Sequence, residues 1–478
     1  MKLFLIGWNG KEIGMIEIAK KLKKNHQILY WTACDIGVDV DPADFPGTVF
    51  HDHDDAYMGI PPKNFDLSEI EPVGMDLIGQ MYETESVVLT MMNKRFEGVG
   101  VLERKHIYYH YLSYWNYILK KFSPERIIFP ALPHTVYNYV LFSLAKKLGI
   151  KTLIFEPTSI RDRTFITEDF TIGSDKLRDK ISALKGKSYT VNNLSSDIKK
   201  YYLKQIDVGQ NNSPEYVKRF FDMYRGYNLL RLKFGVICKQ IAKPSFLVSS
   251  FRFIKRKFGR NSISDYVRLQ WIPDFNKKYI YMPLHYQPEG TTSPLGDAFV
   301  DQILAVEVLS KSLPPGWLIY VKEHPAEWTP RALEYFSYRH KGYYEEMVKN
   351  KNVKLMPMDT DTYTLIRNSQ AVASITGTAC WEGLLRGKPA IVFGHAWYRD
   401  CGGVYKVSNF SDTKMAIKKI IDSPIVESQE VVNYLVALDA TTFKGFRSGW
   451  YQDAADISVE ENIVNHVHAI EEILVHGL

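Results

Sequence analysis

The chain has 478 residues, of which 45% are hydrophobic and 24% charged, and its formal net charge is +6. This length is too great for one hydrophobic core and predicts two domains. The charge falls far short of that of a nucleic-acid-binding protein, but it suits an anionic small substrate or an anionic membrane surface. The four cysteines have no paired spacing, which argues against a disulfide framework and a structural zinc site. No apolar run approaches the roughly 18 residues that span a membrane, so we expect a cytoplasmic protein.

The first part of the chain alternates strand-like and helix-like segments. The strand-like segments lie at residues 2–8, 26–33, 126–132 and 151–157. Helical spacing of apolar residues marks 12–24 and 134–150, and the second of these has lysines in its last turn, before Gly149. Strand–helix–strand alternation with short connections predicts a mostly parallel sheet covered by helices. We expect this domain to occupy residues 1–167.

Residues 168–275 lack this alternation and predict a basic, helical insertion or linker. Between Leu229 and Arg260 the chain has nine lysines and arginines and no aspartate or glutamate. Leucine, isoleucine and phenylalanine interleave with these cations. The segment is typical of a solvated helical linker, and it is also a candidate for peripheral contact with the anionic inner membrane or with an anionic glycolipid.

A second α/β domain is predicted at residues 276–430, followed by a helical segment at 431–478. Its strand-like segments lie at 277–283, 317–321, 352–357, 371–377 and 388–394, with helix-like segments between them. The fold class that we predict is therefore α/β, with two doubly wound Rossmann-like domains facing a cleft, in a GT-B type arrangement.

The sequence VKEHP, which ends at Pro325, follows an apolar run in the second domain. Pro325 stops any regular continuation, so His324 is held at the carboxyl end of a strand with Lys322 just before it. Ligands bind at this edge in open α/β sheets. A capping histidine in an ordinary loop is the alternative.

The sequence SITGTACWEGLLRGKPAIVFG begins at Ser374, where another predicted strand ends. Thr376, Gly377 and Thr378 then open a helix, and the N–H groups of a helix start can join two hydroxyls to form an anion cradle. Glu382, four residues into the helix, can accept two hydrogen bonds from a ribose diol. The same pattern also fits an ordinary strand–helix–strand unit with an N-cap threonine.

The sequence MPLHYQPEGTTSP places three more polar residues after a predicted strand, namely His285, Gln287 and Glu289. We expect Glu289 to emerge at the same sheet edge as His324, which makes it the best-placed carboxylate for nucleophilic or acid–base chemistry. A loop glutamate without a role is the alternative.

In the N-terminal domain, polar residues also follow the strands. Asn9 and Gly10 come after the first strand, His134 after RIIFPAL, and Glu156 and Arg161 at or behind KTLIF. They suit a polyhydroxylated or acidic ligand, although each alone could be structural. HDHDDAYMG has the composition of a metal site, but adjacent ligands do not converge on one ion, so we expect no metal there.

Together these motifs resemble the bacterial capsule polysaccharide biosynthesis family, which includes retaining β-Kdo transferases that use CMP-activated sugars on a GT-B scaffold. VKEHP matches the family's His-Pro motif, whose histidine contacts the CMP phosphate, which implies this role for His324. The run from Ser374 resembles the family's Thr-Gly-Thr, Glu and Gly-Lys-Pro run. The resemblance thereby implies a nucleotide-binding set made of Lys322, His324, Pro325, Ser374, Thr376, Gly377, Thr378 and Glu382.

The third resemblance departs from the family pattern. The family has Pro-Leu-Gln followed, four residues after the glutamine, by an aspartate nucleophile. In PLHYQPE, His285 stands at the glutamine and Glu289 at the aspartate. The resemblance implies that Glu289 attacks the anomeric carbon. Because the remaining polar residues also follow predicted strands, we expect them to contact donor or acceptor, and they are Asn9, Gly10, His134, Glu156, Arg161, His285 and Gln287.

The expected function is a glycosyltransferase of capsule or O-antigen synthesis that transfers a nonulosonate such as Kdo from a CMP-sugar to a glycan or glycolipid acceptor. We expect neither a metal nor another cofactor, and no nucleic-acid partner. Three alternatives stay open: an inverting transferase in which a carboxylate or His134 is the general base, a CDP-polyol phosphotransferase, and a non-catalytic glycan-binding assembly partner.

Overall fold

The computed structural model describes residues 1–477 with some gaps. The gaps are residues 64, 97, 161, 288, 328–338 and 453–454 and, within 208–261, all residues but Leu230, Arg231, Phe234 and Phe251. Arg161 and nearly all of the basic segment therefore lie outside the described residues. The chain divides into two compact units, Met1–Tyr201 with Ser293–Asp297 and Val432–Leu478, and Tyr202–Thr292 with Ala298–Val431.

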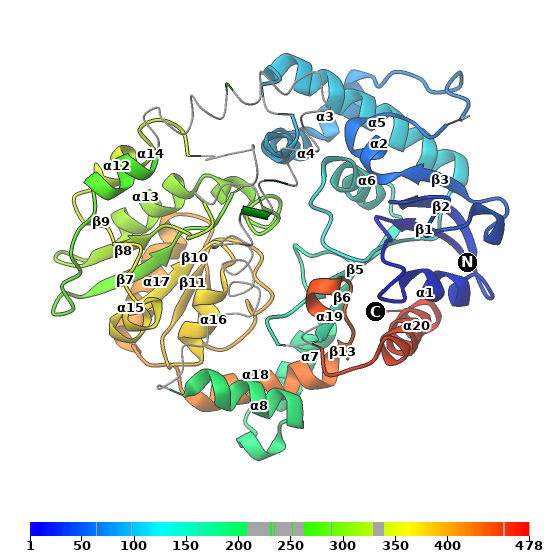
Figure 1. Cartoon of the computed structure of the whole chain (residues 1–478). Coiled ribbons are helices and arrows are strands. Elements are labelled where there is room, and N and C mark those ends of the chain that lie inside the picture. Colours follow the sequence, from blue (N-terminus) through cyan, green and yellow to red (C-terminus); the bar gives the residue numbers. More distant parts are fainter. Residues whose placement is uncertain are drawn as a thin grey trace. The chain divides into compact units, whose positions relative to one another are not determined.

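The first unit is built on a seven-stranded sheet in the order β13-β6-β5-β4-β1-β2-β3 (Figure 1). Its strands are β1 (Lys2–Ile6), β2 (Gln27–Ala33), β3 (Val49–Asp52), β4 (Arg126–Phe129), β5 (Lys151–Pro157), β6 (Arg163–Thr167) and β13 (Phe443–Lys444). The first five are parallel, and β6 and β13 extend one edge in antiparallel pairing. The mostly parallel sheet predicted for this part of the chain is confirmed.

Helices cover both faces of this sheet because successive strand residues point to opposite sides. These helices are α1 (Met15–Leu22), α2 (His53–Met58), α3 (Met75–Gln80), α4 (Tyr82–Met91), α5 (Val101–Phe122), α6 (Val136–Lys147) and α20 (Val459–His476). The chain also forms α7 (Asp175–Leu184), α19 (Gly449–Gln452) and two helices that contain a unit boundary, α8 (Ser196–Ile206) and α18 (Ser428–Thr441). The short 3₁₀ turns are η1 (Pro42–Asp44), η2 (Met92–Lys94) and η3 (Val191–Asn193). Phe4 and Ile6 of β1 pack with α4, α5 and α6. Leu3 and Leu5 pack on the other face, with α1 and α20. Figure 1 shows α20, in red, beside α1.

The second unit is built on a six-stranded, all-parallel sheet in the order β12-β11-β10-β7-β8-β9. Its strands are β7 (Tyr279–Pro283), β8 (Leu318–Lys322), β9 (Val353–Leu355), β10 (Ala371–Ser374), β11 (Ala390–Val392) and β12 (Val404–Lys406). The order places β7 between β10 and β8 in the middle of the sheet. Two Rossmann-like α/β sheets, the predicted fold class, are confirmed.

Alternation again divides the second sheet into two covered faces. Ile280 and Met282 of β7 pack with α12 (Ser262–Arg268), α13 (Gln302–Ser312), α14 (Tyr343–Val348) and α17 (Phe410–Asp422). On the other face lie α15 (Thr362–Asn368) and α16 (Thr378–Leu384), and the Tyr279 hydroxyl donates to the Leu365 carbonyl of α15 at 2.8 Å. A 3₁₀ turn, η4 (Asp297–Val300), precedes α13. The buried strands leave their carboxyl ends as the part of the sheet that can bind ligand.

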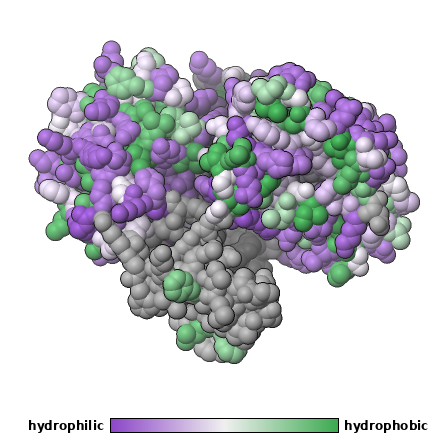
Figure 2. Space-filling view, turned by 90° about the horizontal axis from the view of Figure 1, so that it is seen from above, coloured by the Kyte–Doolittle hydropathy of each residue, from purple (hydrophilic) through white to green (hydrophobic). Residues whose placement is uncertain are grey.

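The surface of the protein mixes polar and apolar residues. On the face shown in Figure 2, hydrophilic and hydrophobic side chains are interspersed. Scattered exposed apolar residues of this kind are ordinary for a globular protein. In the part of the chain that the structure describes, no helix combines the length and the apolar character needed to cross a membrane.

Candidate functional site

The carboxyl ends of β7, β8 and β10 bring three of the predicted motifs to one edge of the second sheet. β7 pairs in parallel with β8 on one side and with β10 on the other. The loops that follow them begin at Leu284, Glu323 and Ile375. Because these strands are neighbours with the same direction, the residues predicted from each motif emerge side by side.

His285 joins the loop after β7 to the turn after β10. Its Nε2 lies 2.9 Å from the Ser374 hydroxyl and accepts a hydrogen bond from the Thr376 N–H at 3.3 Å. The Gly377 N–H in turn donates to the Ser374 hydroxyl oxygen at 3.0 Å. His285 is only 8% exposed, so a buried ring supports the 374–377 turn.

The His285 imidazole is neutral at physiological pH. Burial, and then the charges of His324 and Arg339, lower its pKa to about 3. A neutral ring whose Nε2 lacks a proton can accept from the Thr376 N–H, which a charged ring could not do. Burial therefore sets the protonation state that this turn requires.

Gly377 is required where the turn passes over His285. A Cβ atom placed there would lie 2.6 Å from the Ser374 hydroxyl and 3.4 Å from the His285 ring. That hydroxyl is held by two hydrogen bonds and cannot easily move. A side chain at this position would therefore push the turn away from the sheet edge.

The loop that carries Glu289 is tied to the same turn. The Thr376 hydroxyl donates to the Thr291 carbonyl at 2.7 Å, and the Thr291 hydroxyl donates to the Glu289 carboxylate at 3.0 Å. The Glu289 side chain is exposed. The exposed carboxylate and the 374–377 turn are thus linked through one threonine.

His324 is held at the end of β8 by its own backbone surroundings. The ring Nδ1 of His324 accepts from the Ala326 backbone N–H at 3.1 Å, and the backbone N–H of His324 donates to the Glu323 carboxylate at 2.7 Å. Pro325 separates the two anchors in the sequence. In the neutral ring an accepting Nδ1 leaves the proton on Nε2, so that nitrogen is a hydrogen-bond donor.

A buried ion pair supports the His324 loop. The Arg339 guanidinium donates to both carboxylate oxygens of Glu323, at 2.8 and 2.9 Å, and both side chains are fully buried. The Tyr344 hydroxyl donates to the same carboxylate at 2.6 Å. Arg339 also donates to the His285 carbonyl at 2.7 Å. One guanidinium therefore fixes the loops after β7 and β8 relative to each other.

Gln287 and Gln302 extend this support. Gln287 accepts from Arg339 at 2.9 Å and donates to the Val300 carbonyl at 2.7 Å. The Gln302 amide exchanges hydrogen bonds with the His285 backbone, at 2.7 and 3.1 Å. The hydrogen bonds of both glutamine amides therefore help to hold the loop after β7 in place.

Lys322 is directed to a different loop. Its ammonium group donates to the Thr360 carbonyl and lies 3.2 Å from the Thr362 hydroxyl. The residue is 7% exposed, and burial lowers the pKa of the amine. The structure thus places this cation at the start of α15.

Glu382 lies on α16, as predicted, and is buried. The Thr378 hydroxyl approaches its carboxyl at 3.5 Å, and the residue is 8% exposed. Burial raises the pKa of the carboxyl to about 7, against the smaller lowering effects of Arg386 and Thr378. Glu382 therefore changes charge near neutral pH.

The N-terminal candidates lie in the first unit. Asn9 follows β1, where its side chain accepts from the Cys34 N–H, and Gly10 beside it has a positive φ of 107°. His134 follows β4 and its Nδ1 lies 2.7 Å from the Leu132 carbonyl. Glu156 is partly buried in β5. These four residues lie on three strands or strand ends of one sheet.

The two histidines of HDHDDAYMG point apart. His51 in β3 lies 2.7 Å from the Tyr30 hydroxyl through Nδ1 and 2.7 Å from the Ile60 carbonyl through Nε2. His53 at the start of α2 lies 2.8 Å from the Tyr137 hydroxyl. Among the residues described, no three histidine, cysteine or acidic side chains are placed to share a metal ion.

Residues 297–419 match the model of a family described as capsule polysaccharide biosynthesis protein. The resemblance to this family is confirmed. The matched segment contains the His-Pro motif and the run from Ser374, whereas Glu289 lies before it. No curated protein sequence matches the chain.

Solved structures of low similarity include two transferases and an epimerase. The KpsC β-Kdo 2,7-transferase of Thermosulfurimonas dismutans is 13% identical with a TM-score of 0.32, over 74% of this chain and 88% of that one. The β-Kdo 2,4-transferase of the same organism is 12% identical with a TM-score of 0.32, over 72% and 87%. The UDP-GlcNAc 2-epimerase of Neisseria meningitidis is 14% identical with a TM-score of 0.26, over 99% and 100%. Similarities of this size do not decide activity or substrate.

Replacing Arg339 by Met should destabilise the second unit strongly, because Glu323 would stay buried without its partner. We expect a loss of about 3–5 kcal/mol in the free energy of unfolding, and a smaller loss when Glu323→Gln is added. Arg268 is the matched control, since its 2.6 Å pair with Glu345 is more exposed and Arg268→Met should cost less than about 1 kcal/mol. Denaturant unfolding measures all three variants. Equal losses for Arg339→Met and Arg268→Met would contradict the assigned role.

Replacing Glu382 by Gln should change how stability depends on pH. Because the folded pKa of about 7 exceeds the ordinary value of 4.5, the proton is held more tightly in the folded state. The protonated Glu382 carboxyl therefore contributes stability to the fold that is present below pH 4.5 and is lost as pH rises through 7. We expect Glu382→Gln to be more stable than wild type at pH 8, by up to about 3 kcal/mol, and similar at pH 5. Glu346→Gln, at a side chain that is 43% exposed, is the control in thermal melts at both pH values. An effect of Glu382→Gln that is independent of pH would be inconsistent with this explanation.

Proposed function

We propose that this chain transfers a sugar from a CMP-activated donor to a glycan acceptor in the synthesis of a surface polysaccharide. The observation that carries the proposal is the hydrogen-bonded cluster formed by His285, Ser374, Thr376 and Arg339 with the loops after β7, β8 and β10. Much of this cluster falls within the segment that matches the capsule polysaccharide biosynthesis family. A nonulosonate such as Kdo is the proposed donor sugar, in keeping with the names of the two transferases above.

His324 is proposed to contact the donor phosphate. Its Nε2–H can donate a hydrogen bond because Nδ1 already accepts from the Ala326 backbone. When the bond from the sugar to the phosphate breaks, negative charge grows on the departing CMP. Because the His324 ring is held in place before the reaction, its N–H group stabilises this charge without a reorganisation cost.

Glu289 is proposed as the nucleophile of a retaining reaction. Its carboxylate attacks the anomeric carbon as CMP leaves. The oxygen of the acceptor hydroxyl then displaces the carboxylate while the hydroxyl proton passes to water, which restores the free glutamate. The Thr291 hydroxyl, at 3.0 Å, orients the carboxylate, and Thr376 holds Thr291. Glu382 is proposed to accept hydrogen bonds from the ribose.

Nucleotide preference should appear as thermal stabilisation. We expect CMP, and not UDP or GDP, to raise the melting temperature of wild type by a few degrees at saturation. His324→Ala should weaken CMP binding by about tenfold or more, which is roughly 1.4 kcal/mol. His476→Ala, an exposed histidine at the end of α20, is the matched control. Preferential stabilisation by UDP or GDP, or full retention of the CMP effect in His324→Ala, would refute the CMP assignment.

The role of Glu289 should appear in turnover. We expect Glu289→Gln to lower turnover of CMP-Kdo by about a thousandfold or more, while CMP still stabilises the variant to the wild-type extent. Product anomers are determined by NMR, and the assay is run with and without EDTA and in parallel with CDP-glycerol. Activity within about tenfold of wild type would favour an inverting mechanism. Binding of CMP without consumption of any donor would favour a non-catalytic role.

A further inference from the structure

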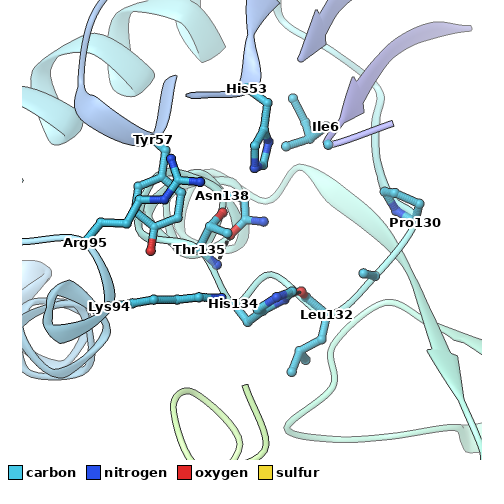
Figure 3. A pocket seen from close by; sticks show the side chains of 12 residues that line it. Ile6, His53, Tyr57, Lys94, Arg95, Pro130, Leu132, His134, Thr135 and Asn138 are labelled. Carbon is cyan, nitrogen blue, oxygen red and sulfur yellow. Dashed lines mark hydrogen bonds between the residues drawn. The ribbon is translucent and has the colours of Figure 1, made fainter. Parts of the chain in front are cut away.

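The first unit contains a pocket at the carboxyl edge of its sheet, with a cavity of about 220 Å³ (Figure 3). The ends of β1 and β4 form its apolar floor, through Ile6 and residues 130–132. Its polar wall includes His53, Tyr57, Lys94, Arg95, His134 and Thr135. The cavity is of a size for a single sugar unit and too small for a length of polysaccharide.

The buried hydroxyl of Tyr57 in this wall lacks a hydrogen-bond partner among the described residues, and the buried hydroxyl of Thr135 has only the capping-box contact of its oxygen with the Asn138 N–H. The residues are only 2% and 7% exposed. A buried polar group without a partner costs about 1–3 kcal/mol, and such groups are rare in folded proteins. Burial raises the pKa of Tyr57 to about 12, so its hydroxyl keeps its proton and can donate. A polar ligand in the pocket would supply the missing partners.

The charged groups of the wall are mainly cationic. Figure 3 shows the Lys94 side chain and the Tyr57 hydroxyl extending into the same pocket. The Arg95 guanidinium lies 4.4 Å from the centre of the Tyr57 ring and pairs with Asp54, at the exposed rim, at 2.7 Å. Burial, and to a smaller extent the charge of Lys94, lowers the pKa of His134 to about 4, so this histidine is neutral.

The start of α6 adds a further preference for negative charge. Thr135 is the N-cap of this 12-residue helix, and its N–H donates to the Asn138 side chain at 2.8 Å, so that side chain is turned back to the helix start. The N-terminal end of a helix carries partial positive charge. The pocket therefore combines hydroxyl donors, two cations and a helix start around one cavity.

We propose that this pocket binds an anionic sugar unit of the acceptor, through its carboxylate or phosphate group. That the bound sugar belongs to an acceptor rests on the proposed glycosyltransferase function. The pocket itself lies in the first unit, and its binding of anions can be tested without a sugar donor. Lys94 pairs with the anionic group, and the hydroxyls of Tyr57 and Thr135 bond to it or to the adjacent sugar hydroxyls.

The test is calorimetric titration of the full chain with Kdo, glucuronate, glycerol 3-phosphate and neutral glucose. We expect at least one class of anion to bind about tenfold or more tightly than glucose. Binding of the two sugar acids alone identifies a carboxylate as the ligand group, and binding of glycerol 3-phosphate alone identifies a phosphate. Equal binding of glucose, or binding of none of the four, would overturn the proposal.

Variants separate ligand binding from structure. Tyr57→Phe and Lys94→Met should each raise the Kd of the anion by about fivefold or more, as for a lost hydrogen bond to a charged group. Tyr57→Phe should leave the melting temperature unchanged or higher, because it removes an unpartnered hydroxyl. Tyr82→Phe on α4 and Lys120→Met on α5 are matched exposed controls and should stay within about twofold. Unchanged affinity in Tyr57→Phe and Lys94→Met would refute the inference.

CMP titrations of the same variants distinguish this inference from the donor proposal. If Tyr57→Phe and Lys94→Met do not weaken anion binding while CMP still binds through His324, only the assignment of the acceptor pocket is wrong. If the anion dependence holds while CMP does not bind, the pocket stands as an anion site and the CMP proposal falls.

Discussion

The buried pair between Glu323 and Arg339 is the interaction on which the candidate site depends. Removing two charges from water is expensive, and it is tolerated only when geometry and further hydrogen bonds are good. Here Tyr344, the His324 N–H and the His285 carbonyl complete the pair. The loops after β7 and β8 are therefore held in one arrangement, which gives the imidazole of His324 a defined direction before any ligand arrives.

The carboxyl edges of the two sheets differ in whether their polar side chains are hydrogen-bonded within the protein. In the second unit, His285, Ser374 and Thr376 bond to one another, so the edge is rigid without ligand. In the first unit, the hydroxyl of Tyr57 is buried without a described partner. Preorganised donors suit a group whose charge develops during a reaction, whereas unsatisfied donors suit a ligand that must be captured.

Sequence patterns predicted the strands of both sheets best where apolar runs were long, as in β2, β5 and β8. They also predicted that His324, Ser374 and Glu289 follow parallel strands. They missed β3, β6, β12 and β13. β6 has no long apolar run and pairs antiparallel with the nearby β5. β3, β12 and β13 have only two to four residues, and β13 pairs antiparallel with β6, which lies far earlier in the sequence. Arg339 was missed for a related reason. Its partners are a carboxylate 16 positions earlier and a carbonyl 54 positions earlier, and no local period reports such a match. Tyr57 and Lys94 lie in segments without a clear pattern, where only the burial of an unsatisfied hydroxyl marks the pocket.

The position of α20 has a consequence for synthesis of the chain. This helix covers the same face of the first sheet as α1, where Ile470 and Leu474 join the core around Leu3 and Leu5. All of the second unit is translated before it. At bacterial and eukaryotic elongation rates, that delay is on the order of tens of seconds. During this time the part of the apolar face that α20 covers stays exposed beside α1. The ribosome-bound chain therefore presents to chaperones an apolar surface that the finished protein does not.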